Sequence, residues 1–154
     1  MRFLIFSFFS ALLLFSACKS GKQASLSPAD IVIGEARSYI GVPYRYGGTS
    51  RGGMDCSGLL LRSFEAIDLE IPRTSKMQRT IGKKVNLNNL KKGDLVFFAA
   101  GKSKRKITHV GLVTELRGKD NVRFIHASTK LGVVESNLMS DYYKKIFRQA
   151  RRVL

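Results

Sequence analysis

The chain has 154 residues, of which 44% are hydrophobic, so it has room for one packed domain and a terminal extension but not for two full domains. It is strongly basic, with 27 lysine and arginine residues against 11 aspartate and glutamate residues and a formal net charge of +16. This balance attracts anionic polymers and anionic lipid headgroups in general, so charge by itself does not select nucleic acid as the partner.

The N-terminal segment has the form of an export signal. Arg2 precedes an apolar run from Phe3 to Phe15, which is followed by small residues and Cys18. The run is shorter than the roughly 20 apolar residues that a membrane-spanning helix needs. Its end, LFSAC, resembles the lipobox of bacterial lipoproteins, in which the cysteine is acylated and becomes the mature N-terminus. We expect a lipoprotein signal peptide over residues 1–17, lipid attachment at Cys18 and a polar tether through residue 28. An ordinary secreted protein with an incidental cysteine is the alternative.

Three helices are expected in the first half of the folded part, because apolar residues recur there at helical spacing. The first has Ser27 as a good N-cap and Pro28 in the first helical position. A glycine-rich loop then separates the first helix from the second. The expected helices cover residues 28–40, a segment that begins at or near Cys56, and a short third segment over residues 72–82, ended by Gly82.

The second half of the chain is rich in Val, Ile and Phe and predicts strands. The pattern is clear over residues 94–100, 107–115 and 122–128, and weaker over residues 132–138 and 147–154. Residues 90–94 predict a turn, with Gly93 at its tight position. Helices followed by strands indicate an α+β fold and not an alternating βαβ arrangement.

Cys56 lies where a predicted helix begins. If Cys18 carries a lipid, Cys56 has no cysteine with which to form a disulfide, since the chain contains only two. A lone thiol in an exported protein is either reactive or a buried, inert small side chain. The pKa of a thiol falls at a helix N-terminus and beside an imidazolium, so this position favours a nucleophile.

The chain has two histidines, His109 and His126, and each lies in a predicted strand. Alternate residues of a strand share one face, so adjacent strands would bring the two rings side by side. Packed against the helix that carries Cys56, His109 would act as a base and His126 would orient its ring. Asp55 and Ser57 flank the cysteine, where backbone N–H groups could form an oxyanion hole.

A cysteine with two histidines also matches the ligand preferences of zinc. The sequence, however, offers no second cysteine near Cys56, no pair of histidines four residues apart and no evident fourth ligand. We therefore expect neither a metal nor another cofactor.

Several motifs in combination resemble one known family. The segments GVPYRYGG, GGMDCSGLLL, IPRTSKMQ, LKKGDLVFF, THVGLV and FIHAS are similar to those of the NlpC-type cell-wall peptidases, a papain-like group of bacterial cysteine endopeptidases, and among them to the Spr-type murein endopeptidase lipoproteins. The resemblance covers residues from about 30 to 154. It implies a papain-like α+β domain over residues 29–154, in which N-terminal helices pack on an antiparallel sheet.

The resemblance also implies roles for residues of this chain. By motif, Cys56 matches the nucleophile, His109 the general base and His126 the third polar residue. The positions that match residues lining the nucleophile pocket or flanking the nucleophile are Tyr44, Asp55 and Ser57. The chain departs from the family between the two histidines, where a longer segment is expected to extend a hairpin and leave the site intact.

Two other motif residues have structural roles in this interpretation. Asp94 is expected to fix a turn. Arg73 is expected to start the third helix, with contact to a substrate carboxylate as the alternative.

The function implied by the resemblance is that of a lipid-anchored murein endopeptidase, which hydrolyses amide bonds in peptidoglycan stem peptides or cross-links as a monomer. A catalytically silent wall-binding lipoprotein, and an amidase or acyltransferase acting on another amide, are the alternatives. We expect a cell-envelope location with no nucleic-acid partner. Lys19 stands where Asp would retain a lipoprotein in the inner membrane, so the outer membrane facing the periplasm is favoured.

Overall fold

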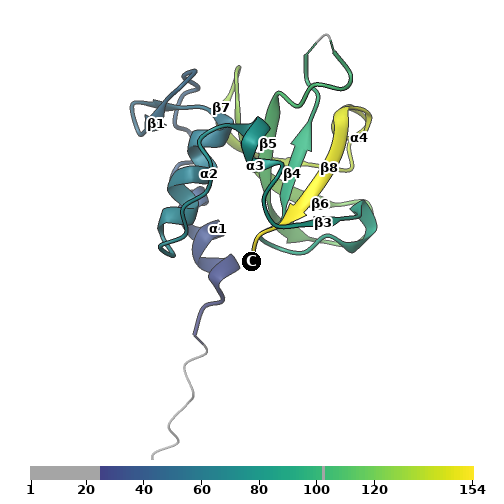
Figure 1. Cartoon of the computed structure of the whole chain (residues 1–154), viewed down its shortest axis with the longest axis horizontal. Coiled ribbons are helices and arrows are strands. Elements are labelled where there is room, and N and C mark those ends of the chain that lie inside the picture. Colours follow the sequence, from purple (N-terminus) through teal and green to yellow (C-terminus); the bar gives the residue numbers. More distant parts are fainter. Residues whose placement is uncertain (1–24, 102) are drawn as a thin grey trace, which may run out of the picture.

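The described part of the protein comprises residues 25–101 and 103–154 of a computed structural model (Figure 1). The expected signal peptide, Cys18 and most of the expected tether lie outside these residues. Helices come first along the chain and strands dominate afterwards, which confirms the predicted α+β class. The helices are α1 (Pro28–Ser38), α2 (Cys56–Glu65), α3 (Ser75–Gln78) and α4 (Asp141–Ile146), with a short 3-10 turn, η1 (Leu87–Asn89).

An antiparallel sheet with the strand order β3-β8-β4-β5-β6-β7 forms the centre of the fold. A hairpin of two very short strands, β1 (Thr49–Ser50) and β2 (Gly53–Met54), lies in the glycine-rich loop before α2. The strands of the main sheet are β3 (Lys83–Val85), β4 (Leu95–Phe98), β5 (His109–Leu116), β6 (Val122–Ser128), β7 (Gly132–Asn137) and β8 (Phe147–Arg152).

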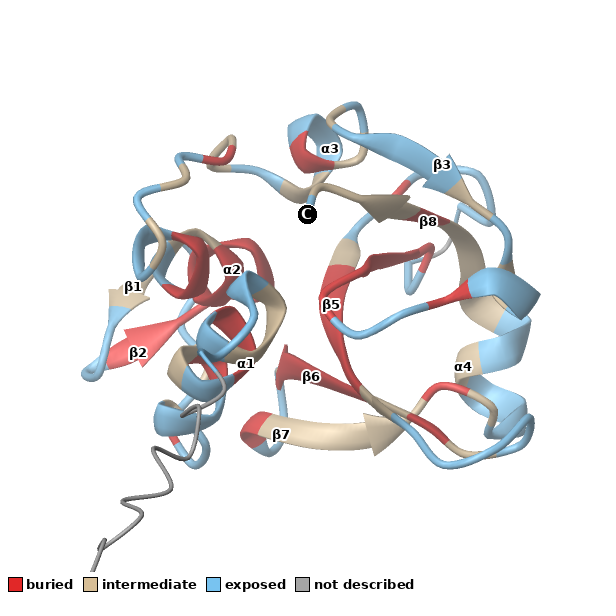
Figure 2. Cartoon of the chain, turned by 90° about the horizontal axis from the view of Figure 1, so that it is seen from below, coloured by how far each residue is buried: buried red, intermediate tan, exposed pale blue. Residues whose placement is uncertain are grey.

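Helix α2 is the element that joins the helices to the sheet. Its inner side chains, Leu59, Leu60 and Phe64, are fully buried and share one apolar core with residues of β5 and β6. Figure 2 shows these buried segments of α2, β5 and β6 facing each other across the interior. Gly58 allows the glycine-rich loop to lie directly on the first turn of α2, because a Cβ at this position would run into the carbonyl oxygen of Gly48.

The turn before β4 has the structure that the sequence predicts. Gly93 has a φ of +85°, a conformation that residues with a side chain rarely adopt. The Asp94 carboxylate accepts the N–H of Lys91 at 2.7 Å and pairs with the Arg152 guanidinium at 2.8 Å. Asp94 therefore fixes the turn and ties it to the C-terminal strand, as expected.

Three elements differ from the prediction. The third helix, α3, is one turn long, shorter than the expected segment within residues 72–82. Helix α4 was not expected, because its six residues are too few to display an apolar period; Tyr143 and Ile146 pack on the buried side of β4 and β6 instead. Strand β3 was not expected either, because its exposed lysines lack alternation, and it exists through its pairing with β8.

The longer segment between the two histidines is a hairpin, as predicted. Strand β5 begins at His109, whereas the hairpin tip lies at residues 117–121, where the Arg117 N–H donates to the carbonyl oxygen of Asn121 at 2.8 Å. The hairpin tip therefore lies at the end of β5 opposite His109.

Candidate active site

The N-terminus of α2 places Cys56. Asp55 is the N-cap of this helix and its carboxylate accepts the Gly58 N–H at 2.7 Å, so Cys56 is the first helical residue. The Cys56 side chain is buried in the core cluster that also contains Val110, and the Val110 N–H opposes the effect of burial on the pKa of the thiol. Because Val110 directly follows His109 in β5, this packing places the thiol beside the strand that carries the histidine.

A network of hydrogen bonds surrounds Asp55. Its two carboxylate oxygens accept both terminal nitrogens of Arg73, at 3.0 and 2.8 Å, and the Ser57 hydroxyl at 2.9 Å. The Gly47 N–H donates to the same carboxylate at 2.9 Å. Burial by itself would raise the pKa of Asp55, but the bonds from Arg73, Gly58 and Ser57 outweigh it and lower that pKa. Asp55 is thus ionised at neutral pH and fastens the glycine-rich loop, α2 and Arg73 to one another.

This network refines the expected roles of three residues. Asp55 and Ser57 do flank the cysteine, but their side chains bond each other and Arg73. Arg73 also lines the hollow that contains Cys56, so it belongs to the site and not only to the start of a helix. No local pattern in the sequence indicates this pairing, since 18 residues separate Asp55 from Arg73.

The sheet brings the two histidines together. His109 Nε2 and His126 Nδ1 are 3.0 Å apart, and the two rings are perpendicular. Leu112 of β5 pairs with Ile125 of β6. One residue further along this antiparallel register, Gly111 lies opposite His126. His109 is two residues from Gly111 on the same strand face, so His109 and His126 are diagonal neighbours on one face of the sheet. Predicted strand alternation therefore places these rings as expected.

Two residues that the sequence did not indicate contact His126 at Nε2, the ring nitrogen that does not face His109. His126 Nε2 lies 3.0 Å from the Ser136 hydroxyl on β7 and 3.1 Å from the Tyr143 hydroxyl on α4. Its ring also stacks on Phe124, with centroids 4.8 Å apart. No sequence motif marked Ser136, and Tyr143 lies on a helix that was not predicted.

These contacts are consistent with one set of tautomers. If His126 donates its Nε2–H to the Ser136 hydroxyl, its Nδ1 is left to accept the Nε2–H of His109. His109 then carries its lone pair on Nδ1. A neutral His109 in this tautomer has the form that a general base needs.

Burial decides the protonation of the three side chains in the free protein. It raises the pKa of the Cys56 thiol to about 11 and lowers the pKa of His109 to about 4. Burial, reinforced by the neighbouring His109 charge, lowers the pKa of His126 to about 3. The sequence suggested a lowered thiol pKa, but the loss of hydration outweighs the hydrogen bonds that lower it. At neutral pH the free protein therefore holds a neutral thiol and neutral imidazoles.

Two adjoining hollows open on these residues. One, of about 320 Å³, is lined by Cys56, Asp55, Ser57 and Arg73 among others, and the second, of about 170 Å³, by His109, His126 and Tyr143 among others. Tyr44 and Thr108 line both. The structure thus places Tyr44 between the cysteine and the histidines. Burial, with smaller contributions from Cys56 and Asp55, raises the pKa of Tyr44, so its hydroxyl stays protonated.

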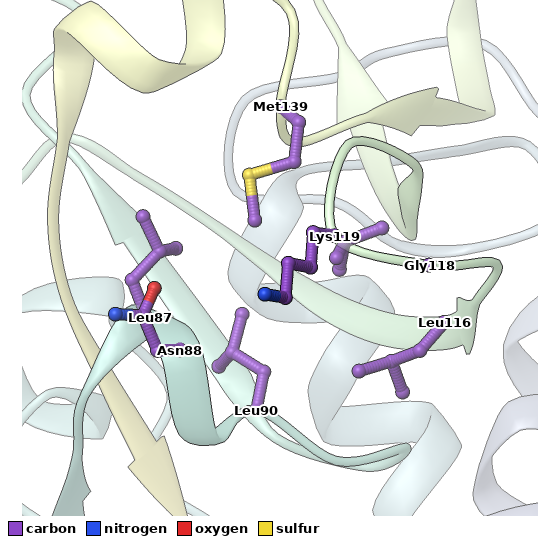
Figure 3. A pocket seen from close by; sticks show the side chains of 8 residues that line it. Leu87, Asn88, Leu90, Leu116, Gly118, Lys119 and Met139 are labelled. Atoms are coloured by element: carbon purple, nitrogen blue, oxygen red, sulfur yellow. The ribbon is translucent and has the colours of Figure 1, made fainter.

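A further cavity of about 500 Å³ lies away from these residues, between η1 and the tip of the β5–β6 hairpin (Figure 3). Lys119 extends from the hairpin tip across this cavity, toward Leu87 and Leu90. None of the predicted site residues lines it, and most of its walls are aliphatic. We therefore do not assign the chemistry to it.

Two further kinds of feature are absent from the described residues. Within residues 25–101 and 103–154, no three side chains of His, Cys, Asp or Glu converge in a way that would hold a metal ion. In the same part of the chain, no helix combines the length and the hydropathy needed to cross a membrane.

Comparisons with known proteins agree with the motifs. The family model described as NlpC/P60 family matches residues 41–152. The chain is 40% identical over 150 residues to the "Probable endopeptidase NlpC" of Escherichia coli (strain K12), an alignment that covers 92% of this chain and 94% of the relative. It is 42% identical over 124 residues to the "Murein DD-endopeptidase MepS/Murein LD-carboxypeptidase" of the same strain, and here the alignment covers 80% of this chain and 62% of the relative.

A solved structure also has the same fold. A crystal structure of an NlpC/P60 family protein from Bacillus cereus ATCC 10987 superimposes with a TM-score of 0.72 at 33% sequence identity. The match covers 82% of this chain and 40% of the solved chain, so this chain spans less than half of that longer protein.

Proposed function

The chain belongs to the NlpC/P60 family of cysteine peptidases that hydrolyse peptidoglycan, and on this premise we propose that it is a murein endopeptidase whose nucleophile is Cys56 and whose base is His109. The observation that carries the proposal is the meeting of the α2 N-terminus with the histidine pair. Cys56, the first residue of α2, packs in one core with Val110, the residue that follows His109, while His109 Nε2 lies 3.0 Å from His126 Nδ1. Residues with these chemistries in this order fit nucleophilic attack on an amide.

The first step transfers a proton and forms a bond. His109 Nδ1 takes the Cys56 proton as the sulfur attacks the amide carbonyl of the stem peptide, so thiolate and imidazolium arise together. This coupling suits a buried site, because burial opposes either charge alone whereas proton transfer within the pair leaves the net charge unchanged. His126 Nδ1 accepts the hydrogen bond from the Nε2–H of the imidazolium, and the Nε2–H of His126 donates to the Ser136 hydroxyl.

The oxyanion formed by this attack needs hydrogen-bond donors. The first turn of α2 supplies the backbone N–H groups of Cys56 and Ser57, which point at the sulfur and have no helical carbonyl partner. His109 then gives its proton to the leaving amine as the C–N bond breaks, which leaves an acyl thioester on Cys56. Water, deprotonated by His109, hydrolyses the thioester and regenerates the thiol. No step requires a metal or other cofactor.

The site of action in this proposal is the cell envelope. Residues 1–17 serve as the lipoprotein signal peptide, residues 18–28 as the acylated Cys18 and tether, and residues 29–154 as the peptidase domain. The family match over residues 41–152 lies inside the proposed domain. The lipid holds the monomeric enzyme on the outer membrane facing the periplasm, within reach of peptidoglycan peptides.

Replacing Cys18 with alanine is expected to abolish acylation and to leave the precursor uncleaved, because the thiol of Cys18 would carry the lipid. Metabolic labelling with a palmitate analogue, followed by gel mobility, measures both effects. Cys56→Ala is the matched control, since it removes the other thiol. Equal labelling of wild type and Cys18→Ala would disprove the lipoprotein proposal.

Incubation of purified muropeptides with the protein tests the activity itself. We expect hydrolysis products by mass spectrometry with wild type, none with Cys56→Ala, and unchanged rates in EDTA. Binding without products would instead indicate a catalytically silent wall-binding protein. Products that appear only when an amine acceptor is added would indicate an acyltransferase, and activity lost in EDTA and restored by zinc would indicate a metal site.

A further inference from the structure

A basic hollow adjoins the histidine end of the candidate active site. It has a volume of about 310 Å³ and receives Lys104 from the loop between β4 and β5, Lys145 from α4 and Arg148 from β8. It shares the lining residues Ala100, Tyr142 and Ile146 with the hollow that contains His109 and His126, so the two hollows adjoin.

The three cations of this hollow have no acidic partner. None of the described residues that line it, or that line the adjoining histidine hollow, is Asp or Glu. Within the described chain, Lys104, Lys145 and Arg148 take part in no ion pair, whereas several other arginines and lysines do. Asp141, at the start of α4, is the acidic residue next to Tyr142 in sequence, yet it does not line the hollow. The positive charges therefore remain available to a ligand.

Arg148 gives this hollow a defined shape. Its Nε donates to the carbonyl oxygen of Lys104, and its Nη1 donates to the carbonyl oxygen of Lys145 at 2.9 Å. These bonds hold the two lysine-bearing segments against each other, while the second terminal nitrogen, Nη2, makes no hydrogen bond within the described residues. A guanidinium with an unbonded terminal nitrogen, in a hollow that two lysines also line, is suited to a carboxylate.

The proposed mechanism decides which half of the substrate reaches this hollow. The acyl half stays bonded to Cys56, on the side of Arg73 and Asp55. The leaving amine must lie beside His109, because His109 protonates it, so the rest of the leaving half extends past the histidines toward Tyr142 and Ile146. Peptidoglycan stem peptides carry free carboxylates at their D-glutamate, diamino acid and terminal D-alanine residues.

We propose that Lys104, Lys145 and Arg148 form a subsite for a free carboxylate on the leaving half of the substrate. This inference rests on the proposed function and deepens it: among amide substrates, the enzyme selects those whose leaving fragment is anionic. The exposed ring of Tyr142 forms the wall between the subsite and the reacting bond.

A pair of peptides that differ only in the leaving fragment tests the proposal. One fragment ends in a free carboxylate and its counterpart in a carboxamide. We expect wild type to favour the carboxylate in kcat/KM by roughly tenfold, mainly through KM, since a charge-assisted contact of this kind changes affinity by about that factor. The preference should weaken as salt rises from low to about 1 M, where screening is nearly complete.

The test variant is the double substitution Lys104→Gln and Lys145→Gln, which is expected to abolish the preference. Its matched control is Lys106→Gln with Lys144→Gln, which removes one exposed lysine from the same loop and one from the same helix, neither of which lines the hollow. Arg148 is left intact because its side chain bonds both backbone segments. Equal preference in the two double variants, or loss of it in both, would overturn the subsite.

Binding to Cys56→Ala separates this inference from the proposed function. The carboxylate fragment and its carboxamide counterpart are titrated by calorimetry, without hydrolysis. A carboxylate preference that disappears in the Lys104→Gln and Lys145→Gln background supports the subsite even if wild type cleaves no muropeptide. Hydrolysis by wild type without any carboxylate preference in rate or in binding rejects the subsite and leaves the proposed function standing.

Discussion

Replacement of His109 by alanine is expected to lower kcat/KM on muropeptides by about 10²–10⁴-fold, the usual contribution of a general acid–base group. The loss has two causes, because His109 would both accept the Cys56 proton and protonate the leaving amine. Alkylation of Cys56 by iodoacetamide at pH 7 should slow as well: the thiol, whose pKa is about 11, is neutral in the free protein, and alanine removes the base that would accept its proton as the sulfur reacts. Initial rates and the pH profile of alkylation measure the two effects separately.

His126→Asn is the companion variant. An asparagine can still accept the Nε2–H of His109, so we expect this variant to lose activity but to lose less than His109→Ala. Circular dichroism and thermal unfolding control for folding in both variants. An inactive His126→Asn beside a His109→Ala that stays active and alkylates normally would reverse the assignment of base and orienting residue.

Lowering the pH from 7 to 5 is expected to reduce the free energy of unfolding by about 2 kcal/mol for each buried histidine. The folded-state pKa values, about 4 for His109 and about 3 for His126, lie below the value of about 6.5 for an exposed histidine. Between these values the unfolded chain binds more protons than the folded chain, so acid favours unfolding. Urea denaturation at pH 7, 6 and 5 measures the loss.

His109→Gln provides the control for this pH dependence. Glutamine does not titrate, so about half of the loss between pH 7 and 5 should disappear. Asp55 does not interfere in this window, because its lowered pKa makes its contribution present above the unfolded value of about 3.9 and lost only below it. A free energy of unfolding that stays constant from pH 7 to pH 5 would show that the histidines are hydrated or already paired with a charge.

The local sequence carried enough information to predict the main elements and three candidate site residues. Strand alternation alone placed His109 and His126 on one face, because side chains of a strand repeat with a period of two whatever the strand packs against. Ser27, Pro28 and the apolar spacing located α1, and the Asp55–Cys56 junction located α2, since caps and helical periods are properties of neighbouring residues.

The tertiary structure alone decided the partners of these residues. Ser136 and Tyr143 reach His126 from β7 and α4, and Arg73 reaches Asp55 from a loop 18 residues away. The basic hollow likewise brings Lys104, from the loop between β4 and β5, to Lys145 and to Arg148, which is 44 residues further along the chain. Such contacts have no local period or motif in the sequence, because they form only when separate segments of the chain pack together.

The protonation of the site also depends partly on local sequence and partly on tertiary packing. From the sequence, a cysteine at a helix N-terminus suggests a thiol that ionises easily, because the helix dipole is a local feature. The structure raises the thiol pKa to about 11, because the packed residues around Cys56 exclude water. Sequence determined which groups are the candidates for the chemistry and in which order they stand along the chain. Tertiary packing determined their hydration, and the free energy of charging a buried group depends on hydration more than on its neighbours in sequence.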